Sequence, residues 1–172
     1  SSTPTADVVE ENGFQFDKST GTITDYTGNE TGTLTIPSSI DGVTVTSIKA
    51  YALGSAKMKE VVIPNTIETL GFGVFQMCSS LEKVTFESGS KVTELKDSMF
   101  YQCTKLKEVV FPKNLKSIKV LAFYKCTSLE TVTLPEGFTT LYNAAFLDCT
   151  NLKTVIVPDS LNHMVMNPFE GC

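Results

Sequence analysis

The chain has 172 residues, enough for one domain, and 14 Lys and Arg residues against 19 Asp and Glu residues give it a net charge of −5 at pH 7. Because proteins that bind nucleic acids or anionic membranes carry a basic face, this acidic balance argues against both partners. No apolar run is long enough to span a bilayer, and no signal peptide opens the sequence, which starts at Ser1 without Met. We expect an export signal or anchor to lie outside this sequence.

The N-terminal segment changes character after residue 12. Residues 1–12 are polar and acidic, which predicts a flexible leader. Beyond them, Phe14 and Phe16 alternate with polar residues, a Gly-containing turn follows, and β-forming residues then resume. This pattern predicts a β-hairpin within residues 13–32, which we expect to cap the open end of a stack of strands.

Residues 33–60 predict an irregular first repeat. A short strand begins at Thr33, and Asp41-Gly42 is a hairpin-turn sequence. Leu53 stands where later units carry phenylalanine, and no cysteine follows it. Terminal repeats commonly depart from the consensus in this way.

Residues 61–172 contain about five repeats, the last of them incomplete. In each unit a phenylalanine is followed three residues later by a cysteine, so that all five cysteines of the chain occupy one slot, and successive cysteines lie 23 or 25 residues apart. A fixed period of this length with one strand per unit is typical of leucine-rich repeats. The pairs are Phe75 and Cys78, Phe100 and Cys103, Phe123 and Cys126, Phe146 and Cys149, and Phe169 and Cys172.

Each unit combines a turn with a strand. Apolar residues from Ile118 to Val132 lie three or four apart, and Leu134 then follows at a step of two, which predicts a helical or 3₁₀ turn leading into a short strand. One slot alternates in charge from unit to unit, as neighbouring rows of a parallel ladder favour. Its residues are Lys59, Glu82, Lys107, Glu130 and Lys153.

These patterns predict a leucine-rich repeat solenoid, with residues 13–172 as one domain. The solenoid is expected to be right-handed and mostly β, with short parallel strands, 3₁₀ or helical turns and an N-terminal β-hairpin cap. Ordering one unit of this length costs more free energy than burying its own apolar side chains returns, so stability must come from contacts between coils.

The repeating unit resembles the BspA-like leucine-rich repeat of surface proteins of anaerobic bacteria. The resemblance rests on two recurring pieces, A-F-x-x-C-x-x-L and V-x-I-P, which are represented by residues 122–126 and 155–158 and which recur over residues 33–172. It implies a secreted or surface-anchored binding protein, with adhesion to host matrix proteins or to other cells in some members. It carries over no catalytic residues.

The cysteines and the single histidine give no sign of catalysis. An odd number of cysteines without closely spaced pairs fits neither a disulfide framework nor a zinc site, so we expect a column of buried free thiols. His163 lies near no nucleophile motif, and phosphate-binding, dinucleotide-binding, metalloprotease and EF-hand motifs do not occur. The sequence therefore predicts a protein that is not an enzyme and has no metal site and no cofactor.

The predicted binding surface is the outward face of the repeat sheet. Solenoid sheets present extended concave surfaces to their partners, and exposed valine and isoleucine among threonines suit contact with a protein. We therefore predict a protein partner, either a host matrix protein or another cell surface, and an extracellular or cell-surface location. The candidate residues are Glu60, Val62, Lys83, Thr85, Glu108, Val110, Thr131, Thr133, Thr154 and Ile156.

Two further hypotheses concern other surfaces. Tyr101 and Tyr124 occupy one slot beside the phenylalanine column and form a candidate aromatic patch, which would suit a glycan-binding module as the alternative function. They would equally serve only to cover the phenylalanines with their hydroxyl groups in water. At the C-terminal end, the strand from Leu152 to Val157 would be an uncapped edge, so either the native chain continues or this edge pairs with a second copy.

Overall fold

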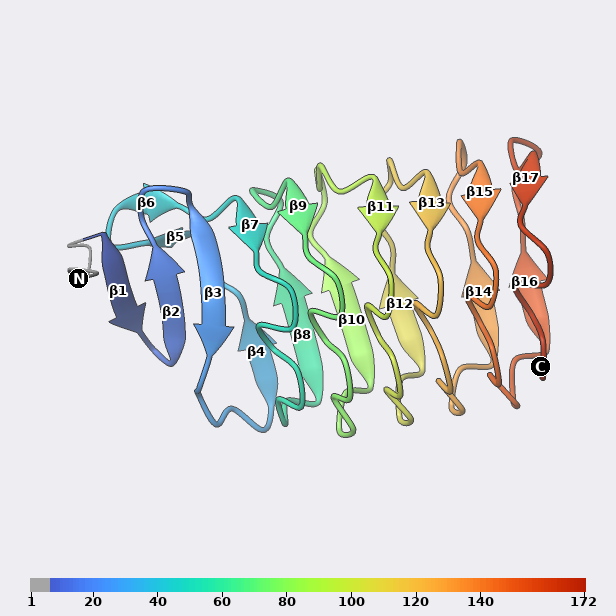
Figure 1. The fold of residues 1–172 in the computed structure, drawn as a ribbon, viewed down its shortest axis with the longest axis horizontal. Helices are drawn as coiled ribbons and strands as arrows, with labels where there is room; N and C mark the ends of the chain where they lie inside the picture. The colour runs from blue at the N-terminus through green and yellow to red at the C-terminus, as the bar shows by residue number, and fades with distance from the viewer. Residues whose placement is uncertain (1–6) are drawn as a thin grey trace, which may run out of the picture.

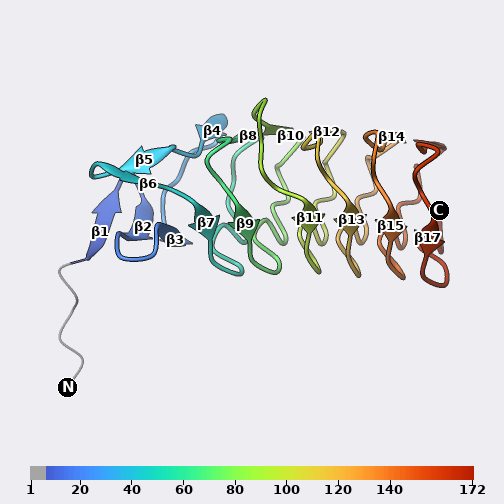
Figure 2. The ribbon, with the colours of Figure 1, turned by 90° about the horizontal axis from the view of Figure 1, so that it is seen from above.

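The computed structural model describes residues 7–172 as a stack of coils whose axis runs from the N-terminal to the C-terminal end of Figure 1. The coils contribute short strands to two walls, which Figure 2 shows on opposite sides of the stack. Neighbouring strands within each wall pair in parallel, so the predicted solenoid of stacked coils is confirmed.

The first wall contains six strands in two parallel groups. The first four strands form one sheet and the last two form another, so the wall is interrupted between β12 and β14. The strands are β4 (Thr33–Thr35), β8 (Glu60–Ile63), β10 (Lys83–Phe86), β12 (Glu108–Val110), β14 (Thr131–Thr133) and β16 (Thr154–Ile156).

The second wall consists of two-residue strands and is interrupted between β9 and β11. Residues 87–91, which make this coil longer than its neighbours, lie just before that interruption. The strands are β7 (Ser47–Ile48), β9 (Thr69–Leu70), β11 (Glu94–Leu95), β13 (Ser117–Ile118), β15 (Thr140–Leu141) and β17 (His163–Met164).

An antiparallel meander caps the N-terminal end. β1 (Val8–Glu11) pairs with β2 (Phe14–Asp17), which pairs with β3 (Thr22–Tyr26), and β3 then continues the second wall by pairing in parallel with β7. A second hairpin joins β5 (Ser39–Ile40) and β6 (Val43–Thr44) through the predicted Asp-Gly turn.

The prediction of a flexible leader over residues 1–12 is wrong for its second half. Val8–Glu11 forms the edge strand β1, and the half-buried Val9 packs against the core. Asn12 and Gly13 both have positive φ, 50° and 86°, and join two paired strands. An Asn-Gly pair in this conformation is the preferred two-residue hairpin turn, and the sequence analysis overlooked this signal. Residues 1–6 lie outside the described part of the chain.

The turns between the walls are not helical. The prediction of helical or 3₁₀ turns leading into the strands is therefore corrected. Only isolated i to i+3 hydrogen bonds occur in them, such as the Cys126 N–H to the Phe123 carbonyl oxygen at 3.2 Å, and residues 7–172 contain no helix. Leu121 and Lys125 have φ of 59° and 54°, so a right-handed helix cannot continue through them. The N–H groups of this turn instead donate hydrogen bonds to carbonyl oxygens of the next coil. The Phe123 N–H, for example, donates to the Ala145 carbonyl oxygen at 2.8 Å.

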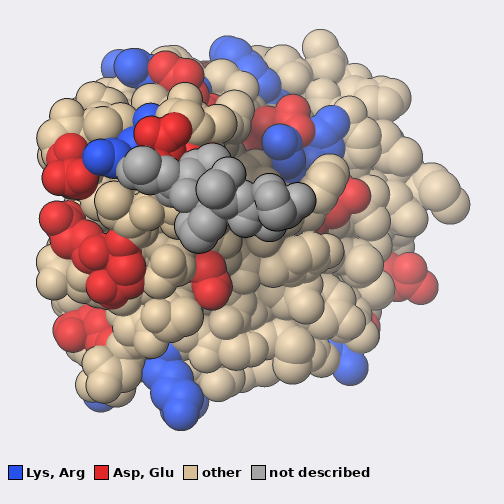
Figure 3. Space-filling model, turned by 60° about the vertical axis from the view of Figure 1, so that its left-hand side comes forward, with Lys and Arg blue, Asp and Glu red and all other residues tan. Residues whose placement is uncertain are grey.

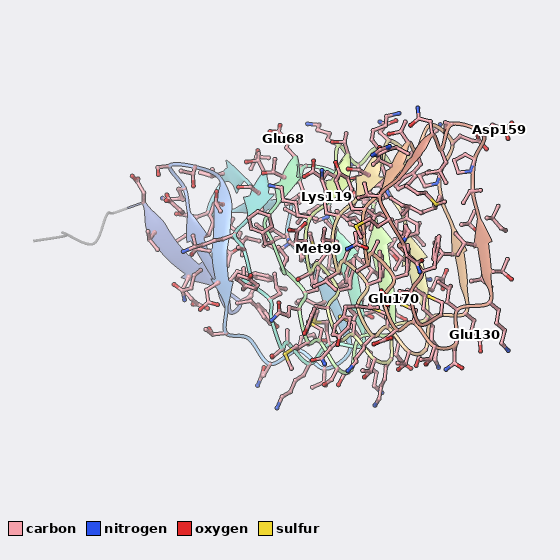
Figure 4. All side chains as sticks on the ribbon, turned by 45° about the vertical axis from the view of Figure 1, so that its right-hand side comes forward. Glu68, Met99, Lys119, Glu130, Asp159 and Glu170 are labelled. Atoms are coloured by element: carbon pink, nitrogen blue, oxygen red, sulfur yellow. The ribbon has the colours of Figure 1, made fainter. Side chains whose placement is uncertain are left out.

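A column of phenylalanine rings fills the interior between the walls. Successive rings from Phe75 to Phe169 stack with centroids 4.9 to 5.6 Å apart, and all except Phe169 are fully buried. Met99, labelled in Figure 4, lies among these interior side chains, whereas Glu68 and Asp159 lie at the upper edge of the stack. The predicted column of like residues is therefore confirmed.

The cysteines form a second column, and each thiol has a defined acceptor. The Cys126 Sγ lies 3.2 Å from the Phe100 carbonyl oxygen and the Cys149 Sγ lies 3.0 Å from the Phe123 carbonyl oxygen, so each thiol donates to the backbone of the coil before it. All five cysteines are free, as predicted, but only four of them are buried, since Cys172 at the C-terminal end is exposed. The thiol is thus a second donor to a carbonyl oxygen that also accepts a backbone N–H within its own turn, as the Phe123 oxygen does from the Cys126 N–H.

Candidate functional site

The first wall places the ten candidate binding residues on one face. In its four-stranded sheet, Glu60, Lys83 and Glu108 form one register row, and Val62, Thr85 and Val110 form another. The remaining four lie outward on β14 and β16, and none of the ten is buried. The period-two alternation of each strand explains this arrangement, because the residues between them point into the core.

Two exposed ion pairs lie on or beside this face. Lys83 Nζ lies 3.7 Å from Glu108 Oε2, and Lys107 Nζ lies 3.7 Å from Glu82 Oε1. Ion pairs of this kind contribute about 0–1 kcal/mol, so they support the register and contribute little to stability. Figure 3, which brings the N-terminal end forward, shows acidic and basic side chains in small separate groups and no broad basic area on the face in view.

The exposed apolar side chains of the face are aliphatic. Val110 is 41% exposed and Ile156 is 52% exposed. Ile156 lies on β16, which pairs with β14 on one side and has no strand partner on the other within the described residues. The edge expected between Leu152 and Val157 is therefore open in this structure.

The predicted aromatic patch consists of two half-buried rings in contact. The ring centroids of Tyr101 and Tyr124 are 4.6 Å apart, and Lys125 Nζ lies 5.2 Å from the Tyr124 centroid. A hydrogen bond to Tyr124 and the attraction of that side chain raise the pKa of Lys125. The sequence analysis missed two more exposed rings, Tyr51 and Phe72, because they lie in turn positions where other coils carry different residues.

The cysteines and the histidine are the remaining groups with nucleophilic or metal-binding chemistry. Burial raises the pKa of the Cys78 thiol to about 12 and that of Cys126 well above the usual range, so these side chains are poor nucleophiles. His163 is exposed on β17. Between residues 7 and 172, no group of His, Cys, Asp and Glu side chains is arranged to hold a metal ion.

The repeat pattern described as the BspA type leucine rich repeat region matches residues 46–172 in six copies. The chain belongs to this BspA-type leucine-rich repeat family. The matched region includes both walls from β7 onward, the phenylalanine column and the cysteine column. The family resemblance seen in the sequence is thus confirmed.

Solved structures of bacterial leucine-rich repeat proteins are similar to this BspA-type chain. A leucine-rich cell surface protein of Faecalibacterium prausnitzii is 30% identical, with a TM-score of 0.80 over 95% of this chain and 45% of the other. A leucine-rich repeat protein of Bacteroides ovatus is 31% identical, with a TM-score of 0.69 over 82% of this chain and 35% of the other. One from Eubacterium ventriosum is 25% identical, with a TM-score of 0.75 over 99% and 51%.

The BspA-type chain thus spans about half or less of the length of these three proteins. No curated protein matches it. The described residues include no helix with the length and apolar character needed to cross a membrane.

Proposed function

We propose that this BspA-type repeat chain is a non-catalytic recognition or adhesion module, secreted or held at a cell surface, that binds a protein through the outward face of its first wall. The observation that carries the proposal is the register of that face, where exposed Val110 and Ile156 stand among threonines and paired charges. Repeat solenoids use such extended faces for binding. The similarity to a leucine-rich cell surface protein of Faecalibacterium prausnitzii supports the location.

A binding array that offers both matrix proteins and glycans tests this function. We expect a protein hit whose binding is weakened about tenfold or more by Val110→Asp, because a charge at the centre of the face opposes apolar contact. Val8→Asp is the matched control, since Val8 is also an exposed strand valine but lies in the cap. If Val110→Asp and Val8→Asp weaken binding equally, the first wall is not the binding surface.

Glycan binding is the second candidate function. The contact between the Tyr101 and Tyr124 rings beside Lys125 favours it, because aromatic faces and polar groups together suit sugar rings. A glycan hit should then lose binding in Tyr124→Ala and keep it in Tyr51→Ala, whose ring is exposed elsewhere. Sugar binding that survives Tyr124→Ala would exclude this patch.

For the chain ending at Cys172, we also propose that the open edge of β16 associates with a second copy; in a longer chain the next coil would cover this edge instead. Ile156, Val157 and Met164 are each about half exposed at this end, and β16 presents unpaired backbone groups. An open, apolar strand edge is a template for pairing with another strand.

A further inference from the structure

The first wall is interrupted between β12 and β14, and specific hydrogen bonds are missing there. In the following coil, the N–H groups of Lys153 and Thr154 donate to the Glu130 carbonyl oxygen at 2.9 and 3.3 Å. The equivalent bonds from Glu130 and Thr131 to the Lys107 carbonyl oxygen are absent from the described chain. Three backbone groups that are paired in other coils are therefore free at this position.

The same two coils remain joined through the second wall and through the turns. β13 pairs in parallel with β15, the Phe123 N–H donates to the Ala145 carbonyl oxygen at 2.8 Å, and the Cys149 thiol donates to the Phe123 carbonyl oxygen at 3.0 Å. The unit spacing here is the regular 23 residues, unlike that beside the second-wall interruption. The opening is thus a local slot in one wall of an otherwise regular stack.

The slot uncovers apolar side chains that neighbouring coils bury. Val109 and Phe111 are half-buried, whereas Val84 and Phe86 at the same register positions are 0% and 3% exposed. The Phe111 ring stands edge-on to the Phe123 ring, with centroids 6.1 Å apart and planes at 72°. The inward side chains of β12 are therefore as exposed as those of a strand at the end of the stack, although β12 lies in the middle of it.

A cavity of about 220 Å³ occupies this slot. Ligand pockets for whole small molecules are typically about 300–1,000 Å³, but an apolar cavity of about 150 Å³ accommodates a benzene ring. The volume therefore suits one ring or one branched aliphatic side chain, and it is too small for a lipid chain. The floor is formed by Val109, Phe111, Phe123, Leu129 and Val132.

The mouth of the slot is polar and adjustable. Lys107, Glu108 and Thr131 lie around it and are exposed, and Figure 4 shows Glu130 at the lower edge of the stack. Phe123 is fully buried at the floor, so an occupant reaches it by moving the long side chains off the mouth. The exposed Lys107 pair with Glu82 resists this movement only weakly.

We propose that this slot binds one aromatic side chain of an extended peptide segment in the protein partner. The segment lies over the mouth, where its amide groups meet the free N–H groups of Glu130 and Thr131. It does not enter between β12 and β14, because Cα atoms of these strands approach within 8 Å and strands in a sheet need about 4.7–4.9 Å on each side. The apolar floor disfavours a sugar, and the free donors and acceptor match an amide backbone. This inference rests on the proposed function, because it takes the partner to be a protein and the first wall to be the surface it meets.

The direct test is NMR titration of the ¹⁵N-labelled chain with the blocked tripeptide acetyl-Gly-Phe-Gly-amide, and with its Gly-Ala-Gly counterpart. We expect saturable shifts at the amides of Glu130, Thr131 and Val109 with the phenylalanine peptide only. Thr131→Trp, which fills the mouth, should weaken binding about tenfold or more. Thr33→Trp is the matched control, because Thr33 is also an exposed threonine and is the first residue of its strand, β4, as Thr131 is of β14.

Amide hydrogen exchange tests the slot independently of any ligand. The amides of Glu130 and Thr131 should exchange faster than those of Lys153 and Thr154, and the phenylalanine peptide should slow them. Equal protection in the free protein would show a closed wall and overturn the inference, as would peptide shifts centred on Tyr124.

Failure of the slot and failure of the proposed function give different results. If the partner from the array loses binding in Val110→Asp but not in Thr131→Trp, the function stands and the slot is not its anchor. If the tripeptide fills the slot while no array protein binds the first wall, the slot stands as an aromatic site and the proposed function fails.

Discussion

Truncation of Phe123 to alanine tests the column that holds the coils together. Its ring is fully buried and stacks between Phe100 and Phe146, with centroid distances of 5.2 and 4.9 Å, while Phe111 meets it edge-on. Truncating a buried phenylalanine to alanine costs about 3–5 kcal/mol in all, and the loss of three ring contacts favours the upper part of that range. We therefore expect the free energy of unfolding to fall by about 4–5 kcal/mol.

Urea denaturation followed by circular dichroism measures this loss, because the chain contains no tryptophan to report by fluorescence. Phe169→Ala is the matched control: its ring is half-buried at the end of the column and stacks only on Phe146. It should cost less than half as much as Phe123→Ala. Equal losses in the two variants, or a Phe123→Ala protein as stable as the parent, would refute the stacking argument.

Three further predictions concern the thiols and the open edge. Cys126→Ala should lower the free energy of unfolding by about 0.5–1.5 kcal/mol, because the buried Phe100 carbonyl oxygen loses the thiol donor and keeps only the Cys103 N–H at 3.1 Å. Cys172→Ala, at the exposed end, should cost less in the same urea assay. Thiols have a pKa near 9.0 when the chain is unfolded, whereas burial raises the pKa of Cys78 in the folded chain to about 12. The stability that the protonated Cys78 thiol contributes is therefore complete below pH 9.0 and is lost as the pH rises toward 12. Melting temperatures measured across that range should fall, and less steeply in Cys78→Ser. For the edge, analytical ultracentrifugation should show a dimer that Ile156→Lys converts to a monomer; a parent chain that is monomeric at all concentrations would exclude the pairing.

The repeat architecture followed from residues that return to the same slot. Phe100 and Cys103 recur at the coil period, and one outward and one inward residue alternate along each strand, so the interior columns and the outward face were both predictable. The helical turns were not, because left-handed positions such as Leu121 and Lys125 carry ordinary side chains that give no sequence signal. The strand β1 was missed, although Asn12-Gly13 is a hairpin-turn sequence that indicates a strand on each side of it.

The sequence by itself determined which side chains point inward and how often the chain winds, because period and hydrophobicity are local properties of each unit. The tertiary structure alone decided which neighbouring strands approach closely enough to hydrogen-bond. That approach depends on how side chains from two coils fill the space between them, as Phe111 and Phe123 do beside the interruption of the first wall. No single unit encodes that fit, so the slot between β12 and β14 appears only when the coils are stacked.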